Sequence, residues 1–105
     1  MKSQQLRKLA PELDSLRLGS GWSIEELSKP QIIVESSYGH SHPGSAHLDQ
    51  LVAEAGKGVN DRGGRAANYF VTDICDGEAQ GHDGMNFSLV SRDIMAAMME
   101  IHVKA

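Results

Sequence analysis

A helix pattern between two strand-like runs is the feature that most limits what this 105-residue chain can fold into. Residues 31–36 and 66–72 are short apolar runs rich in β-branched or aromatic side chains, which is typical of buried strands. Between them, apolar residues recur at helical spacing and form one stripe: Leu48, Leu51, Val52, Ala55 and Val59. Since a helix of this length can act as a crossover, we expect parallel strands joined by a right-handed connection.

A second helix is expected after the second strand, from about residue 88 to 103. The resulting β-α-β-α order belongs to the α/β class. Two strands are too few for a complete sheet, and apolar parallel strands need cover on both faces. We therefore expect residues 29–105 to be the opening part of a larger three-layer α/β/α domain.

Residues 1–28 are expected to form an N-terminal lead-in before that domain. One or two helical turns are predicted at residues 4–9, with Pro11 ending them. A loop is predicted at residues 16–22, followed by a short helix at 23–27 whose N-cap is Ser23.

Composition excludes several classes of protein. A net charge of −4, with scattered basic residues and only two Phe, two Tyr and one Trp, argues against nucleic-acid binding. No apolar run reaches the ~18 residues of a membrane span, and the N-terminus lacks the apolar segment of a secretory signal. A single cysteine cannot form an internal disulfide bond, which fits a reducing compartment. We therefore expect a cytoplasmic protein.

The segment between the second strand and the last helix, residues 73–85, carries the residues best suited to chemistry. Asp76 offers the hard oxygen ligand that Mg²⁺ prefers, whereas Cys75 offers a soft thiolate suited to zinc or an iron–sulfur cluster. Glycines in this segment let the backbone approach a ligand closely. The alternative is a buried cysteine beside acids that cap helices. No complete metal site can be assigned from these residues.

A cluster of histidines, His40, His42 and His47, follows the first predicted strand. These side chains could bind a transition metal or an anionic substrate, or they could belong to a polar turn. Because parallel strands end at the same edge of a sheet, both strand-end loops are expected to face one crevice. This geometry favours a shared site that contains His40, His42, Asp76 and His82.

Five segments resemble the dihydroxy-acid dehydratase and 6-phosphogluconate dehydratase family, in its N-terminal part. The most specific one reads DGEAQGHDGM and is followed by SLVSRDI, a close match to the family signature. The resemblance covers about residues 29–103. The five segments are residues 29–34, 43–48, 63–64, 76–85 and 88–94.

The resemblance implies a hydro-lyase that removes water from a 2,3-dihydroxy acid or sugar acid and yields a 2-keto acid. It implies Mg²⁺ and an iron–sulfur cluster, either 2Fe-2S or 4Fe-4S, as cofactors of the full-length family, and it suggests a homodimer. By position, Asp76 is the Mg²⁺ ligand and Cys75 lies near the cluster. His82, Asp83 and His47 line the substrate pocket, to which we add His42.

The chain also departs from the family pattern. Family members are more than five times longer, and the cysteine-aspartate-lysine motif that supplies further ligands is absent. One cysteine cannot hold a cluster, so we expect the chain alone to be inactive. Two alternatives remain open. The chain could be a non-catalytic truncated paralogue that acts as an interaction module, or a small protein that binds a metal or anion through its histidine loop.

Overall fold

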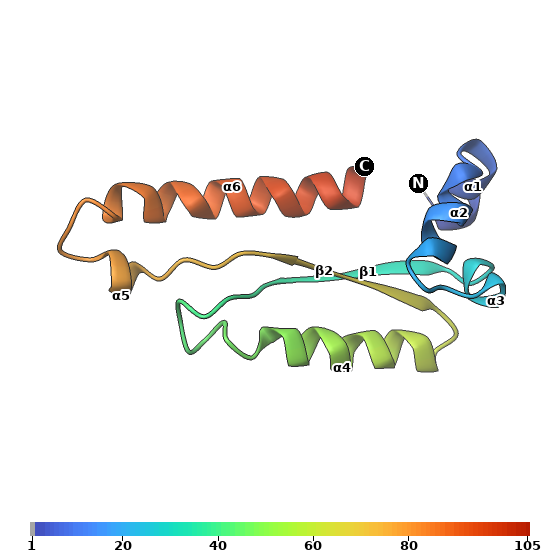
Figure 1. Ribbon diagram of the computed structural model, residues 1–105, viewed down its shortest axis with the longest axis horizontal. Helices are drawn as coiled ribbons and strands as arrows, with labels where there is room; N and C mark the ends of the chain where they lie inside the picture. Colours follow the sequence, from blue (N-terminus) through green and yellow to red (C-terminus); the bar gives the residue numbers. More distant parts are fainter. Residues whose placement is uncertain (1) are drawn as a thin grey trace. The chain divides into compact units, whose positions relative to one another are not determined.

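The computed structural model describes residues 2–105, and it confirms the β-α-β-α order (Figure 1). Strand β1 spans Gln31–Ser37, helix α4 spans Leu48–Asp61, strand β2 spans Arg65–Val71 and helix α6 spans Met85–Lys104. The strands form a two-stranded sheet.

The pairing at the two ends of the sheet shows that the strands are parallel. The Arg65 amide donates to the Pro30 carbonyl at 2.8 Å where both strands begin, and the Tyr38 amide donates to the Val71 carbonyl at 2.8 Å where both end. Gly63, which follows α4, has a φ of +83° and supplies the left-handed conformation expected at a helix C-terminus. Among residues 2–105, no helix is long and apolar enough to cross a bilayer.

The lead-in contains three helices: α1 (Ser3–Leu9), α2 (Glu12–Gly19) and α3 (Ile24–Leu27). The loop predicted at residues 16–22 is therefore wrong for residues 16–19. Pro11 both follows α1 and caps α2, because its fixed φ suits the start of a helix as well as the end of one. The prediction for α3 is confirmed, since the Ser23 side chain accepts from the Glu26 amide in a reciprocal capping box.

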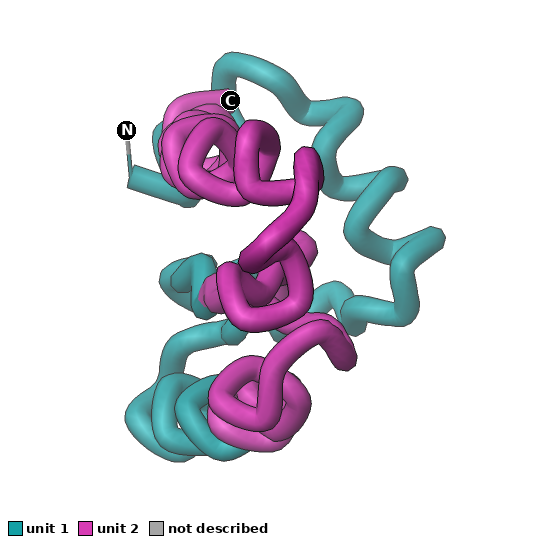
Figure 2. Tube along the Cα trace, turned by 90° about the vertical axis from the view of Figure 1, so that its left-hand side faces the viewer, with its two compact units in different colours: residues 1–34, 54–67 teal, residues 35–53, 68–105 magenta. Residues whose placement is uncertain are grey.

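The chain divides into two compact units, shown in different colours in Figure 2. The first unit comprises residues 1–34 and 54–67, and Trp22 lies at its centre with 8% of its surface exposed. The guanidinium groups of Arg17 and Arg65 lie 4.7 and 4.5 Å from the Trp22 ring, and Arg65 also forms an ion pair with Glu26. These contacts attach the lead-in to the start of β2.

A second ion pair joins α1 to α2 within the same unit. The Arg7 guanidinium donates two hydrogen bonds of 2.6 Å to the Asp14 carboxylate. This bidentate contact lowers the pKa of Asp14 below its ordinary value.

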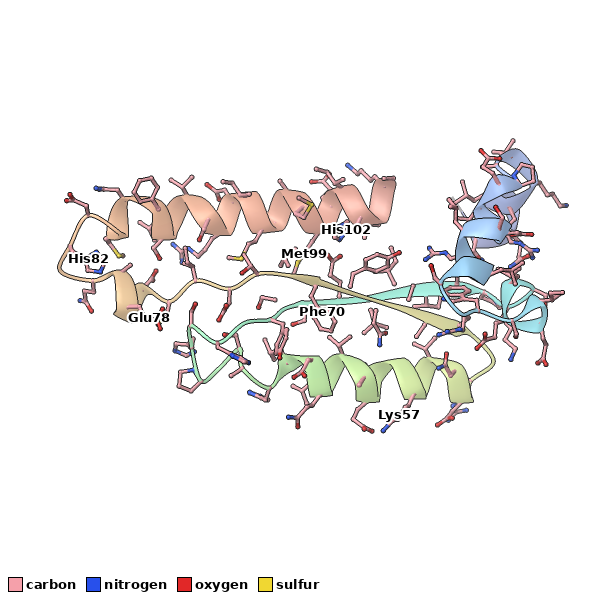
Figure 3. All side chains as sticks on the ribbon, viewed as in Figure 1. Lys57, Phe70, Glu78, His82, Met99 and His102 are labelled. Carbon is pink, nitrogen blue, oxygen red and sulfur yellow. The ribbon has the colours of Figure 1, made fainter. Side chains whose placement is uncertain are left out.

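The second unit comprises residues 35–53 and 68–105, and in it the C-terminal part of α6 lies beside the end of strand β2 (Figure 1). Met99 and His102 extend from α6 towards the strands (Figure 3). The His102 Nδ1 atom lies 2.6 Å from the carboxylate of Glu35, whose side chain is only 8% exposed, and the His102 ring also packs against Tyr69. This pair attaches the C-terminal part of α6 to β1.

Many apolar residues on the two long helices, α4 and α6, are exposed to solvent, although their helical spacing is typical of a buried face. On α4, Val52 is buried, but Leu51 is 54% exposed. On α6, Ile94 is 61% exposed, and the following residues are exposed as well: Leu89, Val90, Ala97, Met98 and Ile101. Two strands offer too little surface to cover these helices.

Candidate functional site

Both strand-end loops lie at the same edge of the sheet, and Asp73 joins them. Its Oδ2 atom accepts a hydrogen bond from the Ser41 amide at 3.1 Å and another from the Ser45 hydroxyl at 2.5 Å. Ser41 and Ser45 belong to the loop after β1, whereas Asp73 follows β2. The two loops therefore contact each other at one edge of the sheet, whereas the crevice expected between them stays a prediction.

The electrostatics of Asp73 follow from these contacts. The Ser45 hydroxyl is the main cause that lowers the pKa of Asp73 below its ordinary value, and the Ser41 amide adds to this effect. Partial desolvation acts in the opposite direction. The Ser45 hydroxyl also binds the His42 carbonyl, and Ser45 lies three residues before α4 begins.

Asp76 is the first residue of a short helix, α5 (Asp76–Ala79), which lies within the segment predicted to be a loop. Its Oδ1 atom accepts a hydrogen bond from the hydroxyl of Ser88, the most deeply buried residue described, with an exposed fraction of 0%. Ser88 lies in the first turn of α6. This bond orients an otherwise exposed carboxylate at the junction of α5 and α6.

Cys75 immediately precedes α5 and is a half-buried free thiol. Its backbone is extended, with φ of −109° and ψ of 121°, and its side chain makes no capping hydrogen bond to α5. Within residues 2–105, no group of three or more His, Cys, Asp or Glu side chains is arranged to hold a metal ion. Asp76 is a suitable oxygen donor for Mg²⁺, and it is the only such donor that the chain brings to this point among the residues predicted as ligands.

Two of the predicted histidines form the same local turn in the two loops. The His42 Nδ1 atom accepts from the Gly44 amide at 2.8 Å, and the His82 Nδ1 atom accepts from the Gly84 amide at 3.0 Å. A Cβ atom at Gly44 or Gly84 would lie 2.7 or 2.5 Å from the histidine ring, so a side chain there would force the ring to shift.

His82 lies close to Glu78 of α5 (Figure 3), and its other ring nitrogen, Nε2, lies 2.7 Å from the Glu78 carbonyl oxygen. Because Nδ1 accepts from the Gly84 amide, Nε2 is the ring nitrogen that can donate to this carbonyl. The exposed His47 ring contacts the Pro43 carbonyl at 3.3 Å. Asp83 is exposed, and its carbonyl accepts from the Asn86 amide at the start of α6. These bonds give the histidines structural roles; their predicted contacts with substrate stay a prediction.

Sequence reasoning missed the two side-chain pairs that fix this region, Asp73 with Ser45 and Asp76 with Ser88. Ser88 stands at the start of the SLVSRDI segment, but it was assigned only as the start of a helix. The helix in fact begins at Met85, after Gly84.

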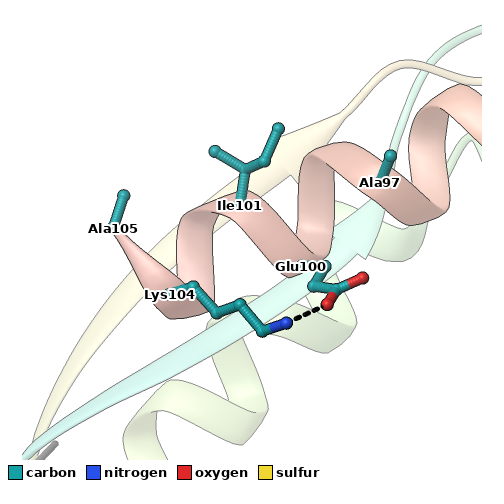
Figure 4. Close-up of a pocket in the computed structure, with 5 residues that line it drawn as sticks. All are labelled: Ala97, Glu100, Ile101, Lys104 and Ala105. Atoms are coloured by element: carbon teal, nitrogen blue, oxygen red, sulfur yellow. Dashed lines mark hydrogen bonds and ion pairs between the residues drawn. The ribbon is translucent and has the colours of Figure 1, made fainter.

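Two apolar hollows lie elsewhere in the second unit. One lies between β2 and α6, where Phe70, Met98 and His102 are among the lining residues. The other lies on the C-terminal part of α6, beside the Glu100–Lys104 ion pair (Figure 4). Neither hollow is lined by residues of the two strand-end loops beyond Thr72.

Comparison with known proteins adds to this geometry. The family profile described as Dihydroxy-acid/6-phosphogluconate dehydratase N-terminal matches residues 29–105. The chain is 41% identical over 91 residues to the dihydroxy-acid dehydratases of Methanococcus aeolicus and of Halothermothrix orenii. It is 36% identical over 91 residues to dihydroxy-acid dehydratase 1 of Methanosarcina acetivorans. Each alignment covers 87% of this chain but only 16% of the relative.

Proposed function

The chain belongs to the dihydroxy-acid/6-phosphogluconate dehydratase family, as an N-terminal domain segment, and on that premise we propose a role in dehydration. The full protein would remove water from a 2,3-dihydroxy acid or sugar acid and release a 2-keto acid. The observation that carries the proposal is the family match across residues 29–105, within which a buried serine orients Asp76. As the chain spans 16% of its curated relatives, the rest of the active site would come from polypeptide outside it.

Asp76 is the residue of this chain that would hold Mg²⁺. Its carboxylate is exposed, and Ser88 restricts its orientation, so the entropy lost on binding a cation is reduced. When bound, Mg²⁺ and an iron–sulfur cluster would supply the positive charge that stabilises the substrate carboxylate and the departing hydroxyl. Cys75 offers one thiol, too few to hold a cluster.

The two strand-end loops would bind and orient the substrate. His42, His47, His82 and Asp83 are the candidate contacts, and all four are exposed. His82 would act as a fixed wall of the pocket while its two ring nitrogens remain bonded to the backbone. We further propose that the protein acts in the cytoplasm and as a homo-oligomer.

The test is a Mg²⁺ titration of the ¹⁵N-labelled chain, followed by amide chemical shifts. We expect millimolar binding, because one carboxylate gives weak affinity, with shifts confined to residues 75–88. Asp76→Asn should abolish these shifts. Asp93→Asn is the matched control, since it removes the same charge from an exposed position on α6. Equal shifts in the Asp76 variant and the wild type would refute the assignment. The chain alone should form no 2-keto acid from dihydroxy acids.

A second candidate function is that of an interaction module. The exposed apolar residues of α6, such as Phe87 at 69% and Ile94 at 61%, favour this reading. Light scattering after size-exclusion chromatography tests it, since a stable monomer at high concentration would contradict self-association. The third candidate, metal or anion binding by the histidine loop, predicts a calorimetric response to Zn²⁺ that His42→Ala removes.

A further inference from the structure

We propose that Asp73 is a positioning residue that holds the loop after β1 against the segment carrying Asp76. We call the contacts of Asp73 with Ser41 and Ser45 the Asp73 clasp. The proposal rests on the proposed function in one respect, namely that the edge formed by these loops is where substrate binds. The clasp itself depends only on contacts within the second unit.

The first argument is that one carboxylate oxygen fastens the loop at two points. Oδ2 of Asp73 accepts from the Ser41 amide and from the Ser45 hydroxyl, four residues further along the chain. Ser45 is buried, with 7% of its surface exposed, so water has little access to replace its bond. A hydrogen bond to an ionised acceptor is also stronger than one between neutral groups.

The second argument is that the loop is shaped around this carboxylate. A Cβ atom at Gly39 would overlap with the Asp73 carboxylate, so the backbone passes the acid at a distance that only glycine allows. Immediately before Gly39, the Tyr38 amide is bonded to the Val71 carbonyl, and its ring packs against Phe70. The sheet therefore fixes the start of the loop, and the clasp fixes its middle.

The third argument is that the Asp73 clasp is connected through a short backbone segment to Asp76, the proposed metal ligand. Asp73 and Asp76 are three residues apart, and Asp76 is bonded to Ser88 on α6. The Ser45–Asp73 and Ser88–Asp76 hydrogen bonds thus attach the loop after β1 to the first turn of α6. The backbone of residues 73–76 connects the two bonds. Loss of the first bond would let His42 and His47 move relative to Asp76.

The role is one of positioning and not of contact with substrate. The Asp73 carboxylate is half-buried, and its Oδ2 atom is already shared by two donors. Asp76, by contrast, is exposed, so it is the acid of this segment that a ligand can reach.

Amide hydrogen exchange and ¹H–¹⁵N spectra of the whole 105-residue chain test the proposal. Asp73→Ala should speed exchange of the Ser41 amide about tenfold and shift the resonances of residues 39–47, while strand amides keep their protection. Ser45→Ala should give a smaller change in the same residues. Asp73→Asn should restore slow exchange, because the amide oxygen can accept both bonds. Asp93→Ala, which removes an exposed acid from α6, is the matched control.

The outcomes separate the clasp from the proposed function. Unchanged Ser41 exchange in Asp73→Ala would overturn the clasp, whether or not Mg²⁺ shifts the amides around Asp76. Uniform acceleration of all amides in Asp73→Asn and Ser45→Ala would also overturn it, since the residues would then act on global stability. Local release of the loop in a chain that shows no Mg²⁺ response would leave the clasp standing and refute the proposed metal site.

Discussion

Substitution of Ser88 by alanine and by valine separates the hydrogen bond to Asp76 from the packing around a side chain that is 0% exposed. Alanine removes the hydroxyl and adds no volume. The Asp76 carboxylate that loses its donor is exposed, so water can replace the bond. Valine removes the same bond and adds a branched apolar group at a position that is closed to solvent.

The magnitudes follow from these differences. A typical intramolecular hydrogen bond contributes about 0.5–1.5 kcal/mol, and alanine recovers about 0.5 kcal/mol through its higher helix propensity. We therefore expect Ser88→Ala to lower the free energy of unfolding by at most about 1 kcal/mol. Overpacking costs about 1–3 kcal/mol in addition to the lost bond, so Ser88→Val should cost about 2–4 kcal/mol.

The assay is urea unfolding followed by far-UV circular dichroism. With a slope of about 1 kcal/mol per molar urea, alanine should lower the midpoint by no more than about 1 M, and valine by about two or more. Equal midpoints for the two variants would refute the tight packing of Ser88 against its surroundings. A loss near 3 kcal/mol for alanine would show instead that the bond to Asp76 is a principal source of stability.

Three further predictions address other parts of the chain. His102→Ala leaves the Glu35 carboxylate, whose side chain is 8% exposed, without its partner, so the free energy of unfolding in urea should fall by about 1–3 kcal/mol. Adding Glu35→Gln in a double variant should restore part of that loss. Gly63→Ala, at a φ of +83°, should destabilise the chain by about 1–2 kcal/mol. Gly58 lies inside α4 with open space around it, so Gly58→Ala should stabilise the chain by about 0.5–1 kcal/mol. A higher melting temperature for Gly63→Ala than for Gly58→Ala would contradict this prediction. The Arg7 partner lowers the pKa of Asp14, so the stability that this pair adds is fully present above the unfolded pKa of about 3.9. That stability is lost as the pH falls through the folded pKa. Asp14→Asn should therefore reduce the loss of stability measured on the acid side of the pH profile.

Local pattern predicted the strands and the crossover helix well, because burial selects β-branched runs and helical spacing directly. The second strand is an example: it was expected at residues 66–72 and spans Arg65–Val71. One error falls where a single residue carries two signals. Pro11 was read only as the end of a helix, although it also begins α2, and Glu12 and Asp14 at the start of α2 favour that N-terminus.

The proximity of the two strand-end loops was predicted, but the side-chain contacts between them were not. The topology of a parallel pair places both loops at one edge, so their meeting follows from the strand order alone. The bonds between Asp73 and Ser45, 28 residues apart, and between Asp76 and Ser88 depend on loop backbone that has no periodicity. Glycine was a partial signal, because Gly39, Gly44 and Gly84 stand where the backbone passes close to another side chain.

The exposure of α6 bears directly on the choice among the proposed functions. Periodicity shows which residues share a helix face, whereas the surroundings decide whether that face is covered. Met95 and His102 lie half-buried on the side facing the strands, while Phe87, Val90 and Ile94 recur at intervals of three and four residues on an exposed side. A helix that is apolar on more than one side is characteristic of the interior of a large domain. Metal binding by an isolated protein does not explain this second apolar face. The face therefore supports the other two proposals, a domain segment or an interaction module.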